Sequence, residues 1–180
     1  MAKIITFDGH DGTGKSTVAL LLNETLQSRG HNTIILSPVQ GFMNNFRKKN
    51  LSVASDIWFY FAAWLLLEKR IELIGATYDY ILVDRSYNST IVLARVKNIS
   101  FPNTITDCFL KPDLAIWIHV DEPARLERLA QKKFDKIDNQ TRDNKLIERA
   151  NLEYEKLNLI KVFASIPPEQ IVKNLLNLLP

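Results

Sequence analysis

Three glycines, a lysine and a serine near the start of the chain have the spacing of a phosphate-binding loop. Gly9 is followed by four residues and then by residues 14–16, which read Gly-Lys-Ser and complete the pattern G-x-x-x-x-G-K-[ST]. Glycines let backbone N–H groups converge on phosphate oxygens without obstruction by a Cβ atom. The Lys15 ammonium can bridge the β- and γ-phosphates of a nucleoside triphosphate, and the Ser16 hydroxyl suits Mg²⁺. The pattern therefore predicts a site for a nucleoside triphosphate with Mg²⁺.

The residues around this loop favour a strand before it and a helix after it. Residues 3–7 form a β-rich run, and residues 18–29 carry apolar residues at helical spacing before Gly30. A helix that starts near Lys15 directs unpaired N–H groups and the positive end of its dipole toward a bound anion. The residues expected to bind the triphosphate are Gly9, Asp11, Gly12, Thr13, Gly14, Lys15, Ser16 and Thr17.

A second polar group stands at the end of another apolar run. Residues 80–83 are typical of a buried strand, and Asp84 and Arg85 come at its carboxyl end. The acid can orient a Mg²⁺-bound water or an acceptor, and the arginine can clamp an acceptor phosphate or the transferred group. The pair favours phosphoryl transfer to a small acceptor, with a simple salt bridge at a strand end as the structural alternative.

The remaining segments predict an α/β fold in a single P-loop domain over residues 1–180. Apolar strands at 33–36, 114–120 and 159–163 alternate with helices, which gives βαβ units and a parallel sheet with helices on both faces. We expect about five strands, with 159–163 at an edge. Ligands of such sheets lie beyond the carboxyl ends of the strands, so the phosphate loop and Asp84 should face one crevice. The other expected helices cover residues 53–74, about 123–131, about 141–156 and a last stretch after Pro167.

Composition and charge argue against several partners. A net charge of +3 comes without a long basic run, so we expect no nucleic-acid partner, and the longest apolar run, residues 57–67, is too short to cross a bilayer. Cys108, the single cysteine, excludes an internal disulfide and fits a reducing cytoplasm, and its neighbour Phe109 favours a core position. The helix at 53–74 is apolar nearly all round, which favours either burial on several sides or an exposed face used in a homodimer.

Four stretches of the chain resemble motifs of the thymidylate kinase family. Residues 7–17 are similar to its opening F-[ED]-G-x-D-G-x-G-K-[ST]-[ST], and residues 83–90 to its D-R-[YF]-x-x-S-[ST] segment. Residues 111–114 match K-P-D-L, and residues 135–138 stand where the family lid has D-R-[IF]-E. The resemblance covers nearly the whole chain and implies a P-loop kinase with a short lid at about 131–140. It also implies ATP-dependent phosphoryl transfer to a nucleoside monophosphate, with thymidylate as the default acceptor.

The resemblance also implies residue roles. Lys15, Asp11, Asp84 and Arg85 would form the catalytic set, and Ser16 with Asp84 would hold Mg²⁺. Asp11 would contact the acceptor sugar or a metal-bound water, and Arg85 the acceptor phosphate. For the acceptor, Arg47 would add a second phosphate contact, while Phe61 would stack on the base with Ser89 beside it.

Three departures from the family pattern bear on the acceptor and on catalysis. Where the family has Asp or Asn followed by an Arg that reads the base, this chain has Trp64 and Leu65, so we expect an apolar wall and altered acceptor preference. The family's A-Y-Q is replaced by residues 92–94, which read Val-Leu-Ala. Gln131 stands at the lid position of a catalytic Arg, so the lid lysines at 132, 133 and 136 are candidates for supplying positive charge.

Other classes of phosphate-loop protein fit this sequence less well. A small GTPase needs a guanine-reading Asn-Lys-x-Asp after a strand, and none occurs in the sequence. A deoxynucleoside kinase needs a carboxylate base for its hydroxyl acceptor, and Ser37 precedes Pro38 where such enzymes carry a Glu. A deoxynucleoside kinase and a nucleotide-binding module without efficient catalysis therefore stay open as the two alternatives.

Overall fold

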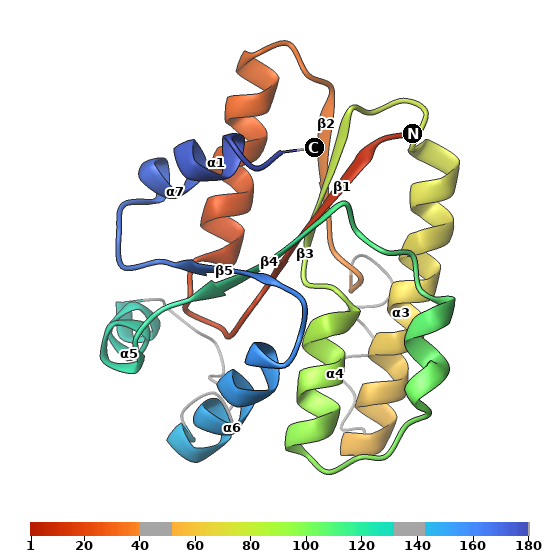
Figure 1. Cartoon of the computed structure of the whole chain (residues 1–180), viewed down its shortest axis with the longest axis vertical. Helices are drawn as coiled ribbons and strands as arrows, with labels where there is room; N and C mark the ends of the chain where they lie inside the picture. The colour runs from red at the N-terminus through yellow and green to blue at the C-terminus, as the bar shows by residue number, and fades with distance from the viewer. Residues whose placement is uncertain (40–51, 132–142, 180) are drawn as a thin grey trace.

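The chain folds around a five-stranded parallel sheet with the strand order β2-β3-β1-β4-β5 (Figure 1). The computed structural model describes residues 1–39, 52–131 and 143–179. The strands are β1 Lys3–Asp8, β2 Thr33–Leu36, β3 Tyr80–Asp84, β4 Leu114–His119 and β5 Ile160–Phe163. The helices are α1 Lys15–Ser28, α3 Val53–Ile74, α4 Tyr87–Val96, α5 Glu122–Gln131, α6 Asn144–Glu155 and α7 Pro168–Leu176, with a 3₁₀ helix, η1, at Asn103–Cys108.

Strand β1 lies at the centre of the sheet and brings the functional segments together. Phe7 stands opposite Asp84 of β3 on one side and Ile116 of β4 on the other. Because all strands are parallel, their carboxyl ends meet at the same edge of the sheet. The residues that follow β1, β3 and β4 are therefore neighbours, although they are far apart in the sequence.

Successive side chains of the central strands point alternately toward the helices on the two faces of the sheet. Ile5 and Phe7 are fully buried against α1 and α7, whereas Ile4 faces α3 and α4. Trp117 of β4 packs against α4 and α6 on that second side. Strands covered on both faces read as continuous apolar runs, which is why the sequence signal for this sheet is strong.

Side-chain caps start three of the helices. The Ser52 hydroxyl accepts from the Ser55 N–H at the start of α3, and the Asp143 carboxylate accepts from two N–H groups of α6. The Ser86 hydroxyl accepts from the Asn88 N–H and begins α4 directly after Arg85. Each cap satisfies N–H groups that have no partner within the helix.

Most of the expected elements are confirmed. All five strands occur, with β5 at an edge, and α3 has the expected bounds. Helix α6 begins at Asn144, three residues later than expected, and residues 103–108 form a 3₁₀ helix that periodicity did not predict. Apart from its first residue, Gln131, the expected lid at about 131–140 lies outside the described residues. Cys108 is exposed rather than buried, because the neighbouring Phe109 takes the core position.

Helix α3 has one buried and one exposed apolar face. Ile57, Phe61 and Trp64 are buried against the sheet and α4. Leu66 and Leu73, in contrast, are 60% and 84% exposed. The expectation of burial on several sides is therefore wrong, and the alternative of a partly exposed apolar face describes the helix. Across the described parts of the chain, no helix is long and apolar enough to cross a membrane.

Candidate active site

The loop between β1 and α1 lies at the carboxyl edge of the sheet and has a backbone that only glycine can supply at its first position. Gly9 has a φ of 132°, and a Cβ atom there would lie 2.4 Å from the carbonyl oxygen of Ile118 in β4. The start of the loop therefore packs directly on the neighbouring strand. Gly14 comes just before α1 and has the left-handed backbone conformation. The N–H groups of the first helical turn, which have no partner within the helix, therefore face the loop.

Lys15 is the first residue of α1, and its side chain is almost completely buried under the loop. Its ammonium Nζ donates to the carbonyl oxygen of His10 at 2.6 Å. Burial, together with the positive charge of Arg85, lowers the pKa of Lys15 to about 7, although Asp11 and Asp84 act in the opposite direction. A phosphate group beside this ammonium would restore the charged form.

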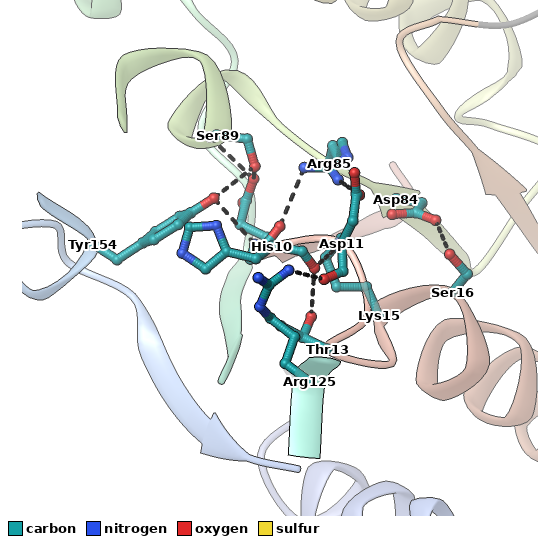
Figure 2. A network of polar contacts seen from close by, with 12 residues as sticks. His10, Asp11, Thr13, Lys15, Ser16, Asp84, Arg85, Ser89, Arg125 and Tyr154 are labelled. Atoms are coloured by element: carbon teal, nitrogen blue, oxygen red, sulfur yellow. Dashed lines mark hydrogen bonds and ion pairs between the residues drawn. The ribbon is translucent and has the colours of Figure 1, made fainter. Parts of the chain in front are cut away.

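Ser16 and Asp84 meet in front of the loop. The Ser16 hydroxyl donates to the Asp84 carboxylate at 2.6 Å, which joins the start of α1 to the end of β3 (Figure 2). Hydroxyl and carboxylate oxygens are the ligands that Mg²⁺ prefers, and Mg²⁺ commonly takes few protein ligands and completes its shell with phosphates and water. The described residues contain no group of three or more His, Cys, Asp or Glu side chains that could hold a metal. The Ser16–Asp84 pair thus fits Mg²⁺ accompanied by phosphates, rather than a metal held by protein ligands alone.

Arg85 follows Asp84 in a strained conformation and turns back over the loop. Its φ is 75°, which is uncommon for a residue with a side chain, and its N–H donates to the carbonyl of Phe7 at 2.9 Å. The guanidinium forms an ion pair with Asp11 and donates to the Gly9 carbonyl at 3.2 Å. The two residues expected to serve the acceptor are thus partners of each other in this structure (Figure 2).

Ser89 belongs to a buried network beneath the loop. Its hydroxyl donates to the Asp8 carboxylate at 2.5 Å and lies 3.1 Å from the Tyr154 hydroxyl. Asp8 also accepts from the N–H and hydroxyl of Ser86 at 3.0 and 2.7 Å. Ser89 lines the cavity described next, but its hydroxyl already has two protein partners.

A cavity of about 420 Å³ opens beside Arg85 and is walled by three helices. Tyr60 and Trp64 of α3 line one side, α4 provides the floor, and Ile147 and Ala150 of α6 line the other side. Its polar lining residues are His10, Asp11, Ser37, Asp84, Arg85, Ser86, Ser89, Thr90, Lys97, Arg125 and Tyr154. A space of this size can hold a small molecule, with its charged end at Arg85 and an apolar end between the helices.

Two expectations for the cavity need correction. Phe61 is 2% exposed and packs on Phe101 and Phe109, so it is a core residue and does not line the cavity. Leu65 is 44% exposed on the outer face of α3 and is likewise absent from the lining. Neighbouring positions on a helix point 100° apart, so the wall comes from Tyr60 and Trp64 instead. Arg47 and the three lid lysines lie outside the described residues.

Two arginines of α5 also contact the loop, and neither was expected from the sequence. Arg125 is 1% exposed, forms a bidentate ion pair with Glu122 and donates to the Asp11 carbonyl at 3.0 Å. Arg128 donates to the carbonyl of Thr13 at 3.2 Å. Arg125 and Arg128 are three residues apart on a helix, which places both side chains on one face. This spacing is the feature of the sequence that could have predicted their shared role.

Comparisons with known proteins agree with this geometry. The sequence model of the thymidylate kinase family matches residues 7–175. A thymidylate kinase from Caldicellulosiruptor saccharolyticus is 33% identical over 157 residues, which cover 78% of this chain and 76% of that protein. One from Prosthecochloris aestuarii is 28% identical over 190 residues, which cover 93% of this chain and 83% of that protein.

The fold also matches a solved structure. Thymidylate kinase from Candida albicans superposes with a TM-score of 0.72 over 98% of this chain and 90% of that one, at 15% sequence identity. At that identity the similarity supports the fold alone, and the family follows from the sequence matches. Because the family model spans the phosphate loop, Asp84, Arg85 and all helices that wall the cavity, this chain is a P-loop phosphotransferase that belongs to the thymidylate kinase family.

Proposed function

We propose that this protein transfers the γ-phosphoryl group of ATP to thymidylate, with Mg²⁺ as cofactor. The observation that carries the proposal is that two polar pairs meet beside one cavity, which Asp11, Asp84 and Arg85 line. Ser16 with Asp84 and Arg85 with Asp11 flank the loop that holds Lys15. The Ser16–Asp84 pair suits a metal–triphosphate, and the Arg85–Asp11 pair suits an anionic acceptor. Phosphoryl transfer must bring these two substrates together.

On the donor side, the loop and the start of α1 bind the triphosphate. The loop N–H groups and the positive end of the α1 dipole face the β- and γ-phosphates, and the Lys15 ammonium exchanges its His10 carbonyl partner for phosphate oxygens. Ser16 and Asp84 supply oxygen ligands for Mg²⁺, which neutralises the charge that develops on the phosphates during transfer. Lys15 and the loop act in the same way by stabilising this charge electrostatically.

On the acceptor side, Arg85 orients a nucleophile that is already anionic. Its guanidinium can hold the acceptor phosphate through two parallel N–H···O bonds once Asp11 no longer occupies it. A monophosphate oxygen needs no base to remove a proton, whereas a nucleoside hydroxyl does. At the end of β2 the cavity has Ser37 rather than a carboxylate, which favours the monophosphate.

The direct test is an ADP-release assay with a panel of nucleosides and nucleoside monophosphates. We expect turnover with thymidylate and none with thymidine. Lys15→Ala should lower kcat/KM roughly 100-fold to 1,000-fold, because a preorganised charge on the transferring group is lost. Circular dichroism would check that this variant is folded. Turnover of thymidine alone, or a fully active Lys15→Ala variant, would contradict the proposal.

The proposed contact between Lys15 and phosphate predicts a linked proton. In the free protein, burial and Arg85 lower the pKa of Lys15 to about 7, and bound phosphates raise it again. At pH 8 the free side chain is mostly neutral, so ATP binding should take up about one proton, and ATP affinity should fall as the pH rises above 7. Calorimetry at pH 8 in two buffers of different ionisation enthalpy measures the uptake. The same uptake in Lys15→Met would show that another group is responsible.

The acceptor base is proposed to lie between α3 and α6, against Tyr60 and Trp64. Tyr60→Ala removes one aromatic wall, so the KM for thymidylate should rise roughly fivefold to tenfold, corresponding to about 1–1.5 kcal/mol, while the KM for ATP stays unchanged. Tyr78→Ala is the matched control, since Tyr78 is also a partly buried tyrosine and does not line the cavity. Equal effects of the two substitutions on the KM for thymidylate would place the base elsewhere.

We also propose that the exposed face of α3 joins two copies of the chain. Its apolar stripe consists of Trp58, Ala62, Leu65, Leu66 and Leu73. On a helix of 3.6 residues per turn these side chains fall within an arc of about 100°. Exposed apolar side chains gathered on one face mark an interaction surface, and the exposed Lys69 interrupts this one between Leu66 and Leu73.

Light scattering after gel filtration tests the homodimer. The wild type should elute with twice the mass of one chain, and Leu66→Glu should shift it toward the monomer, because a buried unpaired charge at an interface is unfavourable. Leu152→Glu is the control, since Leu152 is 63% exposed on α6, outside the stripe. A wild type that is monomeric at micromolar concentration would refute the homodimer.

A further inference from the structure

Helix α6 reaches beneath the phosphate loop and contacts two successive loop residues. The Tyr154 hydroxyl accepts from the Gly9 N–H at 3.2 Å, and the Asn151 amide oxygen lies 3.0 Å from Nε2 of His10. Figure 2 shows the Tyr154 and His10 side chains next to each other, to the left of the loop in that view. One helix, more than 140 residues further along the chain, thus holds the first half of the loop.

Gly9 can be held only through its backbone, and both of its polar groups are engaged. Tyr154 takes the N–H, and Arg85 donates to the carbonyl at 3.2 Å. Glycine reaches the φ of 132° without strain but can adopt many other conformations, so these bonds and the packing on β4 select this one. Without the Tyr154 hydroxyl, the buried N–H of Gly9 would lose its partner.

His10 links α6 to the carbonyl that Lys15 engages. The His10 carbonyl accepts from Lys15 Nζ at 2.6 Å and from the Thr13 hydroxyl at 2.9 Å. Its ring meets the Tyr154 ring edge-on, with centroids 5.6 Å apart. Burial lowers the pKa of His10 to about 4, so the ring is neutral at pH 7 and can donate from Nε2 to Asn151. The neutral ring also adds no further cation beside Lys15 and Arg85.

Tyr154 is itself rigidly placed. Its ring stacks on Trp117 of β4 with centroids 5.2 Å apart and an interplanar angle of 15°. The hydroxyl also lies 3.1 Å from Ser89 Oγ, which donates to the buried Asp8. A side chain fixed at both its ring and its hydroxyl loses little freedom when it holds the loop, so the loop can be preorganised before ATP arrives.

We propose that Asn151 and Tyr154 are positioning residues that hold Gly9 and His10 in the conformation that binds the ATP phosphates. They act through these two loop residues and do not contact the reacting atoms. The inference depends on the proposed function only in taking ATP as the ligand, so ATP binding without an acceptor can test it even if phosphoryl transfer fails.

The test compares the Kd for ATP and for adenosine in Asn151→Ala and Tyr154→Phe. We expect the Kd for ATP to rise roughly threefold to tenfold in each variant, as for the loss of one buried hydrogen bond. The Kd for adenosine should stay unchanged, because adenosine has no phosphate for the loop to bind. The double variant His10→Leu with Asn151→Ala should be no weaker than His10→Leu alone, since both substitutions remove the same contact.

Matched controls separate positioning from general stability. Asn174→Ala removes a similar amide contact on the distant α7, and Tyr80→Phe removes a hydroxyl at the opposite end of the sheet. Neither should change the Kd for ATP. An unchanged Kd for ATP in Asn151→Ala, or an equal loss of adenosine binding, would overturn the proposal. If Tyr154→Phe fails to fold, Asn151→Ala and the double variant still decide the outcome, because Ala favours the helix.

Discussion

The buried carboxylate of Asp8 is the constraint on which the site depends. It is completely shielded from water and accepts four hydrogen bonds, from the N–H and hydroxyl groups of Ser86 and Ser89. An uncompensated charge at this depth would be strongly unfavourable, so the start of α4 must stay docked on the end of β1. The positive end of the α4 dipole stabilises the same charge. Arg85, the residue just before Ser86, connects β3 to α4 with a positive φ of 75°.

Around this anchor, the cations at the loop have protein partners that substrates can replace. Lys15 donates to a loop carbonyl, and Arg85 is paired with Asp11. In the proposed function, each cation would exchange one oxygen acceptor for a phosphate oxygen that carries more charge. Arg125 differs from these two cations. It is buried and forms a bidentate ion pair with Glu122, so its partners remain within the protein. Its contact with the Asp11 carbonyl supports the loop from the α5 side, as Tyr154 does from the α6 side.

The apolar half of the cavity shows how one helix serves two surfaces. Tyr60 and Trp64 face the cavity, while Leu65 and Leu66 face away from the domain. A helix that is apolar all round can therefore wall a binding site on one face and offer an interaction surface on another. The linear pattern could not separate these faces, because apolar side chains occur at almost every position and the period of 3.6 residues is hidden.

The sequence by itself determined the α/β class, the strand bounds, the phosphate loop and its family, because these depend on local patterns: apolar runs, a glycine spacing and short motifs. The convergence of the loop with Asp84 at one edge of the sheet also followed from the rule for parallel strands. Only the tertiary structure decided that Phe61 is a core residue, that Leu65 is exposed, and that Tyr154 contacts Gly9 across 145 positions of sequence. Such contacts are set by how helices rotate and dock on the sheet. No local pattern encodes that rotation, because it is the joint result of packing against several elements that are distant in the chain.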